Sequence, residues 1–263
     1  MRHVGAIALR EIRSTFSTPI AYALFTVYAV LGGVVFFLTL SDFLNEVNAA
    51  QVRGQLQLLQ ILNLNTDVIG PSIGFFCVLF ALLLVPVLTM RSFAEERANG
   101  TIELLLTSPI TPTELVLGKY LGVVTMIGVL VLLTGLYPGL LFVFGDPEPL
   151  QTLAGLMGLL LLGCGLAAIG CFCSAVTSSQ MIAALLSFVA GLMLLLFSSF
   201  SDQLARRGGP DWLGSAVSYL GTGEHFGNMV AGSVRSEDLV YWALMIVLFL
   251  FLARAVVDSL RWR

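Results

Sequence analysis

Two cysteines separated by one residue, Cys171 and Cys173, come closest in this sequence to a metal-binding pattern. They lie in an apolar stretch that we expect to be helical, where residues two apart point about 200° away from each other. Their sulfurs would therefore diverge. The other two cysteines, Cys77 and Cys164, also lie in apolar runs and not in the loops typical of a disulfide framework. We interpret all four as small buried side chains and predict no metal site.

Glu224 and His225 form a second candidate, because they are the only adjacent ionisable pair with an imidazole in the segment between residues 201 and 238. Two residues do not make a metal site. We favour a polar cluster at the membrane interface, and the sequence does not indicate its role.

Nucleotide chemistry would need a phosphate-binding loop, and the sequence has none. Gly118-Lys119 is the only Gly-Lys pair. Thr113 stands where the first glycine of that motif is required, and Tyr120 follows the lysine. No nucleophile elbow and no His-Glu-x-x-His motif is present either. The sequence therefore predicts a non-catalytic chain that binds no cofactor.

The composition indicates a membrane protein. The chain has 263 residues, of which 57% are hydrophobic and 11% are charged, whereas a soluble domain carries about 25% charged residues. So few charges cannot cover a surface in contact with water, and lipid must be the main solvent. The formal net charge of −3 does not indicate a nucleic-acid partner.

A bilayer span needs about 20 predominantly apolar residues. Six stretches meet this requirement, and we predict them as transmembrane helices: 20–40, 71–90, 120–144, 150–174, 181–200 and 239–257. With the N-terminus in the cytoplasm, most basic residues fall inside: Arg2, Arg10, Arg13, Arg91, Arg97, Lys119, Arg254, Arg261 and Arg263. The outside holds only Arg53, Arg206, Arg207 and Arg235. This bias predicts that both termini are cytoplasmic.

Residues 1–18 precede the first span and have the pattern of an amphipathic helix. Gly5, Leu9, Ile12 and Phe16 share one face, and Arg10 and Arg13 lie on the other. We expect this helix to lie along the inner membrane surface. The alternative is an extension of the first span, but Pro19 favours a break.

Two segments are expected outside the membrane. Residues 41–70 are polar and favour helix, so we expect an external helix lying against the spans, with Pro71 in the first turn of the second span. Residues 201–238 are expected to hold two short interfacial helices, Trp212–Leu220 and Glu224–Ala231. Ser236, with the two acidic residues after it, is expected to cap the last span.

The loop between the second and third spans, residues 91–114, is the most informative segment. Gly100 is a helix stop signal, and Thr101 is a plausible N-cap for a short leucine-rich helix, Ile102–Leu106. Thr111 to Glu114 form a capping box that starts the next long helix. Leucine side chains in a cytoplasmic loop would be exposed to water unless other protein atoms cover them. Either this chain's own helix ends supply that cover, or the short helix docks a cytoplasmic partner.

Three segments carry a resemblance to a known family: Phe93-Ala-Glu-Glu-Arg97, Gly100-Thr-Ile-Glu-Leu-Leu-Leu-Thr-Ser-Pro109 and Leu117-Gly-Lys-Tyr120. They resemble the permeases of ABC-2 type ABC transporters. The chain is most similar to the gliding-motility-type permease, and the permease of nitrous oxide reductase maturation is a relative. Residues Arg10 to Tyr22 are similar to the first helix of that family.

This resemblance implies an all-α membrane protein of the type V exporter kind, with an N-terminal amphipathic helix, six transmembrane helices in a single domain and a cytoplasmic coupling helix. It implies an ABC ATPase partner that carries ATP and Mg, and a second permease, either a copy or a paralogue. It also implies a location in the bacterial inner membrane. The residues implied to couple to the ATPase are Glu95, Glu96, Arg97, Gly100, Thr101, Ile102, Glu103, Leu104 and Leu105.

The spans have almost no ionisable residues, which argues against a proton- or sodium-coupled carrier. Energy is expected to enter mechanically, through the loop. Two functions remain open: a permease subunit that couples ATP hydrolysis to export, or a scaffold that transmits force to a periplasmic partner and passes no cargo. Small residues such as Gly118 with Gly122 and Gly135 with Gly139 are interpreted as helix-packing positions.

Overall fold

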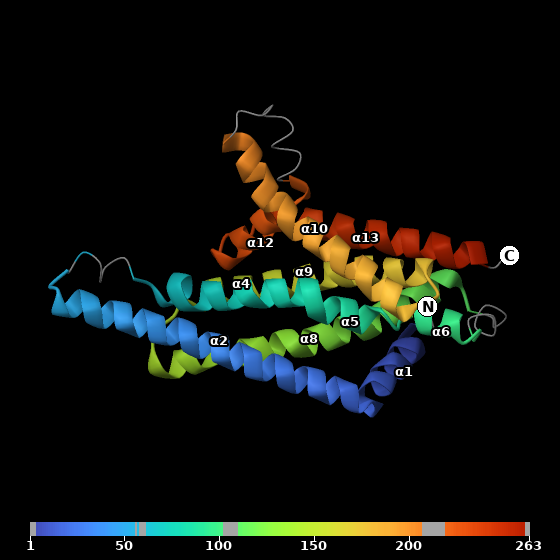
Figure 1. Ribbon diagram of the computed structural model, residues 1–263, viewed down its shortest axis with the longest axis horizontal. Helices are drawn as coiled ribbons and strands as arrows, with labels where there is room; N and C mark the ends of the chain where they lie inside the picture. The colour runs from blue at the N-terminus through green and yellow to red at the C-terminus, as the bar shows by residue number, and fades with distance from the viewer. Residues whose placement is uncertain (1–3, 56, 58–61, 102–109, 207–218, 261–263) are drawn as a thin grey trace.

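The structure, a computed structural model, describes residues 4–55, 57, 62–101, 110–206 and 219–260, and its elements are all helical (Figure 1). In chain order they are α1 (Val4–Ser17), α2 (Pro19–Val52), the π-helical turn η1 (Asn65–Ile69), α4 (Gly70–Leu79), the π-helical turn η2 (Phe80–Leu84), α5 (Val85–Thr89), α6 (Ala94–Ala98), α8 (Pro112–Phe144), α9 (Pro149–Val176), α10 (Gln180–Arg206), α12 (Thr222–Val230) and α13 (Ser236–Ser259).

Six helical stretches of the described chain are long and apolar enough to cross a membrane, which confirms the predicted class of fold. They are Ala21–Val52, Asn65–Ala98, Pro112–Phe144, Pro149–Val176, Gln180–Phe197 and Ser236–Ser259. Large apolar side chains on their outer surfaces, such as Leu132 and Phe144, are exposed as a lipid-facing surface requires.

Helix α9 forms the centre of the bundle. Its apolar window is 72% buried by the rest of the protein, compared with 17% for the span in α2. Glycines make this close packing possible: a Cβ on Gly165 would lie 2.7 Å from Met245 of α13, and one on Gly163 would lie 2.6 Å from Ile127 of α8. Small residues on the central helix thus let its neighbours approach closely.

The amphipathic helix and the break after it are present as predicted. Thr18 has an extended backbone, Pro19 occupies the first turn of α2, and α1 runs at a clear angle to α2 (Figure 1). On the predicted apolar face, Leu9 is exposed and Ile12 and Phe16 are half-buried. Phe16 packs on Phe25 of α2 at a ring-centroid distance of 5.9 Å, so this face is partly covered, and its contact with lipid stays a prediction.

Helix α2 is longer than the sequence suggested. The first span was predicted to end at residue 40 and to give way to a separate external helix. Instead α2 continues unbroken to Val52, because the residues after 40 contain no glycine or proline. It stops where Gly54 adopts a positive φ of 67°, a conformation that glycine adopts readily.

The second span also begins earlier than predicted. Pro71 was expected in its first turn, but the helix is already formed at Asn65. The turn η1 comes just before Pro71, and η2 comes just before Pro86. A proline lacks the amide hydrogen and crowds the carbonyl four residues earlier. A preceding π-turn widens the helix at that point, so this helix contains two prolines without ending.

The segment before the last span, which was predicted to be external, is partly described. Helix α10 runs past residue 200 to Arg206, and α12 lies close to the predicted helix Glu224–Ala231. Most of the predicted helix Trp212–Leu220 lies outside the described residues. The predicted cap at Ser236 is wrong, because Arg235 is the N-cap of α13 and no side chain caps it. Asp238 instead pairs with His225, as described below.

Candidate coupling site

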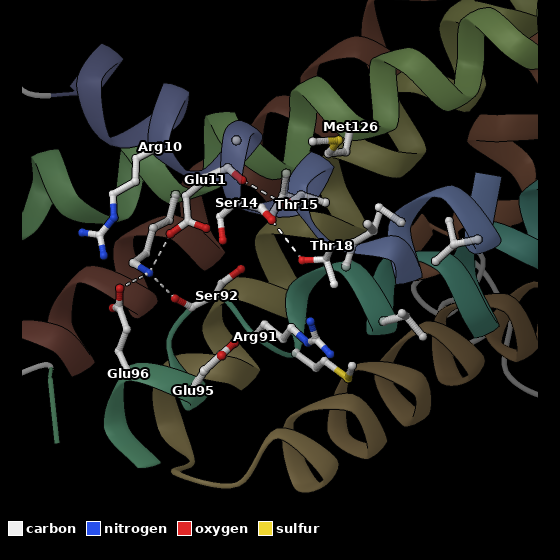
Figure 2. Close-up of a pocket in the computed structure, with 18 of the residues that line it drawn as sticks. Arg10, Glu11, Ser14, Thr15, Thr18, Arg91, Ser92, Glu95, Glu96 and Met126 are labelled. Carbon is white, nitrogen blue, oxygen red and sulfur yellow. Dashed lines mark hydrogen bonds and ion pairs between the residues drawn. The ribbon is translucent and has the colours of Figure 1, made fainter. Parts of the chain in front are cut away.

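A buried lysine joins the elements at the end of the bundle that holds α1, α6 and the end of α13 (Figure 1). Lys119, near the start of α8, is 2% exposed. Its Nζ lies 3.0 Å from Oε1 of Glu11 on α1 and 2.9 Å from Oε1 of Glu96 on α6 (Figure 2). It also donates to the backbone carbonyl of Ser92. One cation thus holds α1, α6 and the chain just before α6 onto α8.

The glycines on either side of Lys119 let α1 reach it. A Cβ on Gly118 would lie 2.7 Å from Cβ of Ile7, and a Cβ on Gly122 would lie 2.7 Å from Cβ of Glu11. Both distances are shorter than van der Waals contact. The predicted packing role of Gly118 and Gly122 is therefore confirmed, and the helix that they admit is α1.

The first part of the loop is fastened to the end of α9. Oγ of Ser174 accepts hydrogen bonds from the amides of Phe93 and Ala94, at 3.0 and 3.1 Å. Nη1 of Arg97 donates to the carbonyl of Ala175, at 2.5 Å. Carbonyls in the last turn of a helix lack helical partners and carry partial negative charge, so a guanidinium stabilises them.

Of the nine predicted coupling residues, five lie in the part of the chain that the structure describes. Glu95, Glu96 and Arg97 are half-buried on α6, and Thr101 is exposed. Gly100 has a φ of 69°, which confirms it as the stop signal of α6. Four predicted residues lie outside the described part of the chain: Ile102, Glu103, Leu104 and Leu105. The capping box is confirmed, because Thr111 accepts from the amide of Glu114 and the Glu114 side chain accepts from the amide of Thr111.

Sequence reasoning missed Glu11, Lys119 and Ser174 as parts of this site. Two signals were available. Lys119 is the only lysine in the sequence, and Glu11 is the only acidic residue before Asp42. A single acidic residue in a basic helix and a single lysine at the start of a span are candidates for an ion pair with each other. Nothing in the sequence indicated Ser174, which is one of many serines near helix ends.

The second candidate, Glu224 with His225, separates in the structure. Glu224 is exposed, whereas His225 is buried and its Nδ1 lies 2.6 Å from Oδ1 of Asp238. Its ring stacks on Tyr241 at a centroid distance of 4.0 Å, and Nε2 lies 3.2 Å from the carbonyl of Tyr219. Within the described ranges, no three His, Cys, Asp or Glu side chains are grouped as a metal would require. This cluster joins α12 to the start of α13.

The structure thus has six apolar helical spans, and ion pairs to Lys119 join α1 and α6 to α8 at the base of the loop. A comparison with protein families matches residues 5–206 to the ABC-2 family transporter proteins. The chain belongs to the ABC-2 family. The match covers α1, the loop and the first five of the six candidate spans, so it includes every element of the Lys119 cluster.

Membership makes this protein a membrane permease component of an ABC-2 type transporter. Members are typically non-catalytic membrane subunits, and the family implies an ABC ATPase as partner. A comparison with curated proteins found no match.

Proposed function

We propose that this ABC-2 permease is driven by a separate ATPase subunit that docks on residues 91–114 and binds ATP and Mg itself. Hydrolysis there would be coupled to export or to conformational work across the bacterial inner membrane. In this proposal the loop and both termini are cytoplasmic. The shared position of α1, α6 and the end of α13 at one end of the bundle supports that arrangement (Figure 1).

The Lys119 cluster is the observation that carries the proposal. It connects α6, the visible start of the loop, to α1 and α8 through contacts of about 3 Å. Phe93, fully buried just before α6, places its ring centroid 5.2 Å from Nζ of the same lysine. A displacement of α6 by a docked ATPase would therefore be transmitted to a transmembrane helix and to the helix on its surface.

The contacts also suggest different roles for the predicted residues. Glu96 and Arg97 are held by Lys119 and Ala175, so we assign them to positioning the loop. The side chain of Glu95 has no ion-pair or hydrogen-bond partner among the described residues and is half-buried, so we assign it to direct contact with the ATPase. Ile102, Leu104 and Leu105 would seat the coupling helix, and Gly100, Thr101 and Glu103 would shape its start.

The finer classification is part of the proposal. The segments Phe93–Arg97 and Gly100–Pro109 support the gliding-motility-type subgroup, with the nitrous oxide reductase maturation permease as a relative. The permease would pair with a second copy or with a paralogous membrane protein. The alternative is a scaffold that transmits force to a periplasmic partner and passes no cargo. Transport of a substrate across the membrane by the reconstituted complex would contradict this alternative.

The test introduces Glu95→Lys into this chain and co-expresses the variant with a candidate ABC ATPase subunit. Glu95→Lys is expected to reduce co-purification of the ATPase about tenfold or more, because it replaces a negative charge with a positive charge in the proposed interface. Its thermal unfolding should match the wild type. Arg13→Ala, an exposed change on α1, is the matched control. Full co-purification and full ATPase stimulation with Glu95→Lys would show that the docking assignment is wrong.

A further inference from the structure

A cavity of about 430 Å³ opens beside the Lys119 cluster (Figure 2). It lies between α1, the start of α2, the α5–α6 segment and α8. Its walls differ at its two ends. Arg10, Arg91 and Glu95 line the polar part, and Leu24, Phe25 and Val87 line the apolar part.

The polar part carries both signs of charge. Arg10, Arg91 and Lys119 face Glu11, Glu95 and Glu96 around the same space. Lys119 is already paired with Glu11 and Glu96 through one oxygen of each. The guanidinium groups of Arg10 and Arg91 and the carboxylate of Glu95 remain without ion-pair partners in the described part of the chain. Oε2 of Glu96 is buried and has no hydrogen-bond partner there.

An apolar groove continues from this cavity along the membrane-spanning helices. It has a volume of about 270 Å³ and is lined by aliphatic side chains and Tyr28 from α2, α4, η2 and α5. Leu24 and Val87 line both spaces, so the groove adjoins the cavity. Val27 and Leu83, in the wall of the groove, are 53% and 48% exposed, so the groove is open to the lipid side of the bundle.

We propose that the cavity and groove together bind one phospholipid of the phosphatidylethanolamine type from the surrounding bilayer. Arg10 and Arg91 bind its phosphate, because guanidinium groups form charge-assisted hydrogen bonds with phosphate oxygens. Glu96, whose Oε2 has no hydrogen-bond partner among the described residues, accepts from its primary ammonium, and Glu95 lies at the same wall. One acyl chain occupies the groove beside Val27 and Leu83.

The charged side chains that line the cavity determine which phospholipid headgroup fits it. A phosphatidylglycerol headgroup has no cation to place against Glu95 and Glu96. A choline headgroup carries a positive charge but no N–H to donate to these carboxylates, which leaves acceptors unsatisfied. A primary ammonium supplies three donors. The pairing of positive and negative side chains around one space thus matches a zwitterion with an N–H donor.

The test uses the purified full-length permease without any ATPase, so its outcome is independent of the proposed function. The protein is reconstituted in nanodiscs of equal parts phosphatidylethanolamine, phosphatidylglycerol and phosphatidylcholine, and native mass spectrometry identifies the lipids that it retains. One phosphatidylethanolamine is expected to be enriched about tenfold over either other lipid, which is the ratio that one lost charge-assisted contact produces.

Two pairs of variants separate this site from general lipid contact. Arg10→Ala with Arg91→Ala should abolish the enrichment, whereas Arg13→Ala, on the same helix outside the cavity, should keep it. Val27→Trp should fill the groove and abolish it, whereas Val30→Trp, also exposed on α2 but outside the groove, should not. Retention of the three lipids in equal amounts, preference for phosphatidylglycerol, or enrichment that survives both cavity variants would overturn the proposal.

Discussion

Nζ of Lys119 lies 2.9 Å from Oε1 of Glu96, so the start of α8 is bound directly to α6, the first helix of the loop at residues 91–114. Glu11 completes the cluster from α1 at 3.0 Å. The cation is almost fully buried, whereas its two acidic partners are partly exposed. Removing the cation therefore leaves charges that the protein interior solvates poorly.

Lys119→Met is expected to destabilise the permease by about 3 kcal/mol, because it leaves Glu96, Glu11 and the Ser92 carbonyl without their donor. Thermal unfolding of the full chain in detergent measures the effect. Combining Lys119→Met with Glu96→Gln should recover part of the loss, since the double variant removes an unpaired charge. Additive losses in the two variants would contradict a direct interaction between these side chains.

Asn65→Leu is expected to cost about 2 kcal/mol, because Asn65 joins η1 to the start of α9 by two backbone contacts. Its Oδ1 accepts from the amide of Glu148 at 2.9 Å, and its Nδ2 donates to the carbonyl of the same residue at 3.0 Å. The exposed neighbour change Thr66→Ala is the control. Chemical unfolding of both variants gives the comparison, and equal midpoints would refute the role of this amide.

Gly170→Ala is expected to destabilise the bundle by about 1–3 kcal/mol, because a Cβ at this position would lie 2.7 Å from Cβ of Thr89 on α5. Gly139→Ala is the matched control, since a Cβ on Gly139 would meet nothing within 4 Å. The control should be neutral or slightly stabilising, as alanine favours helix over glycine. Comparable unfolding midpoints for the two variants would argue against tight packing of α5 on α9.

His225→Phe should destabilise the contact between α12 and the start of α13 by about 2 kcal/mol. Phenylalanine can keep the stack on Tyr241, but the buried carboxylate of Asp238 loses the partner that lies 2.6 Å from it. Glu224→Gln, a change at the exposed neighbour, should stay within about 0.5 kcal/mol of the wild type. Thermal unfolding distinguishes the two variants, and a neutral His225→Phe would mean that the pair adds no stability.

Much of the architecture could be read from the chain. Runs of apolar residues long enough for a bilayer predicted the six spans, because length and hydropathy alone decide whether a helix can reside in lipid. Pro19, Gly100 and the Thr111–Glu114 capping box marked helix ends correctly, because such signals act on the backbone within a few residues. The predicted C-terminal end of α2 and the predicted start of the second span were wrong, because Gly54 and the π-turns outweighed the change in hydropathy.

The contacts between distant segments were decided only by the tertiary structure. Glu11, Glu96 and Lys119 lie in three separate segments, and no periodicity relates them. Their meeting depends on α1 folding back onto the glycines of α8, and His225 likewise reaches Asp238 only because α12 packs beside α13. The sequence by itself determined that this is a membrane protein with six apolar spans, because apolar length and composition suffice for that, and its resemblance to a known family indicated an ABC-2 permease. Which charges are buried, paired or left without an ion-pair partner depends on the packing of whole helices.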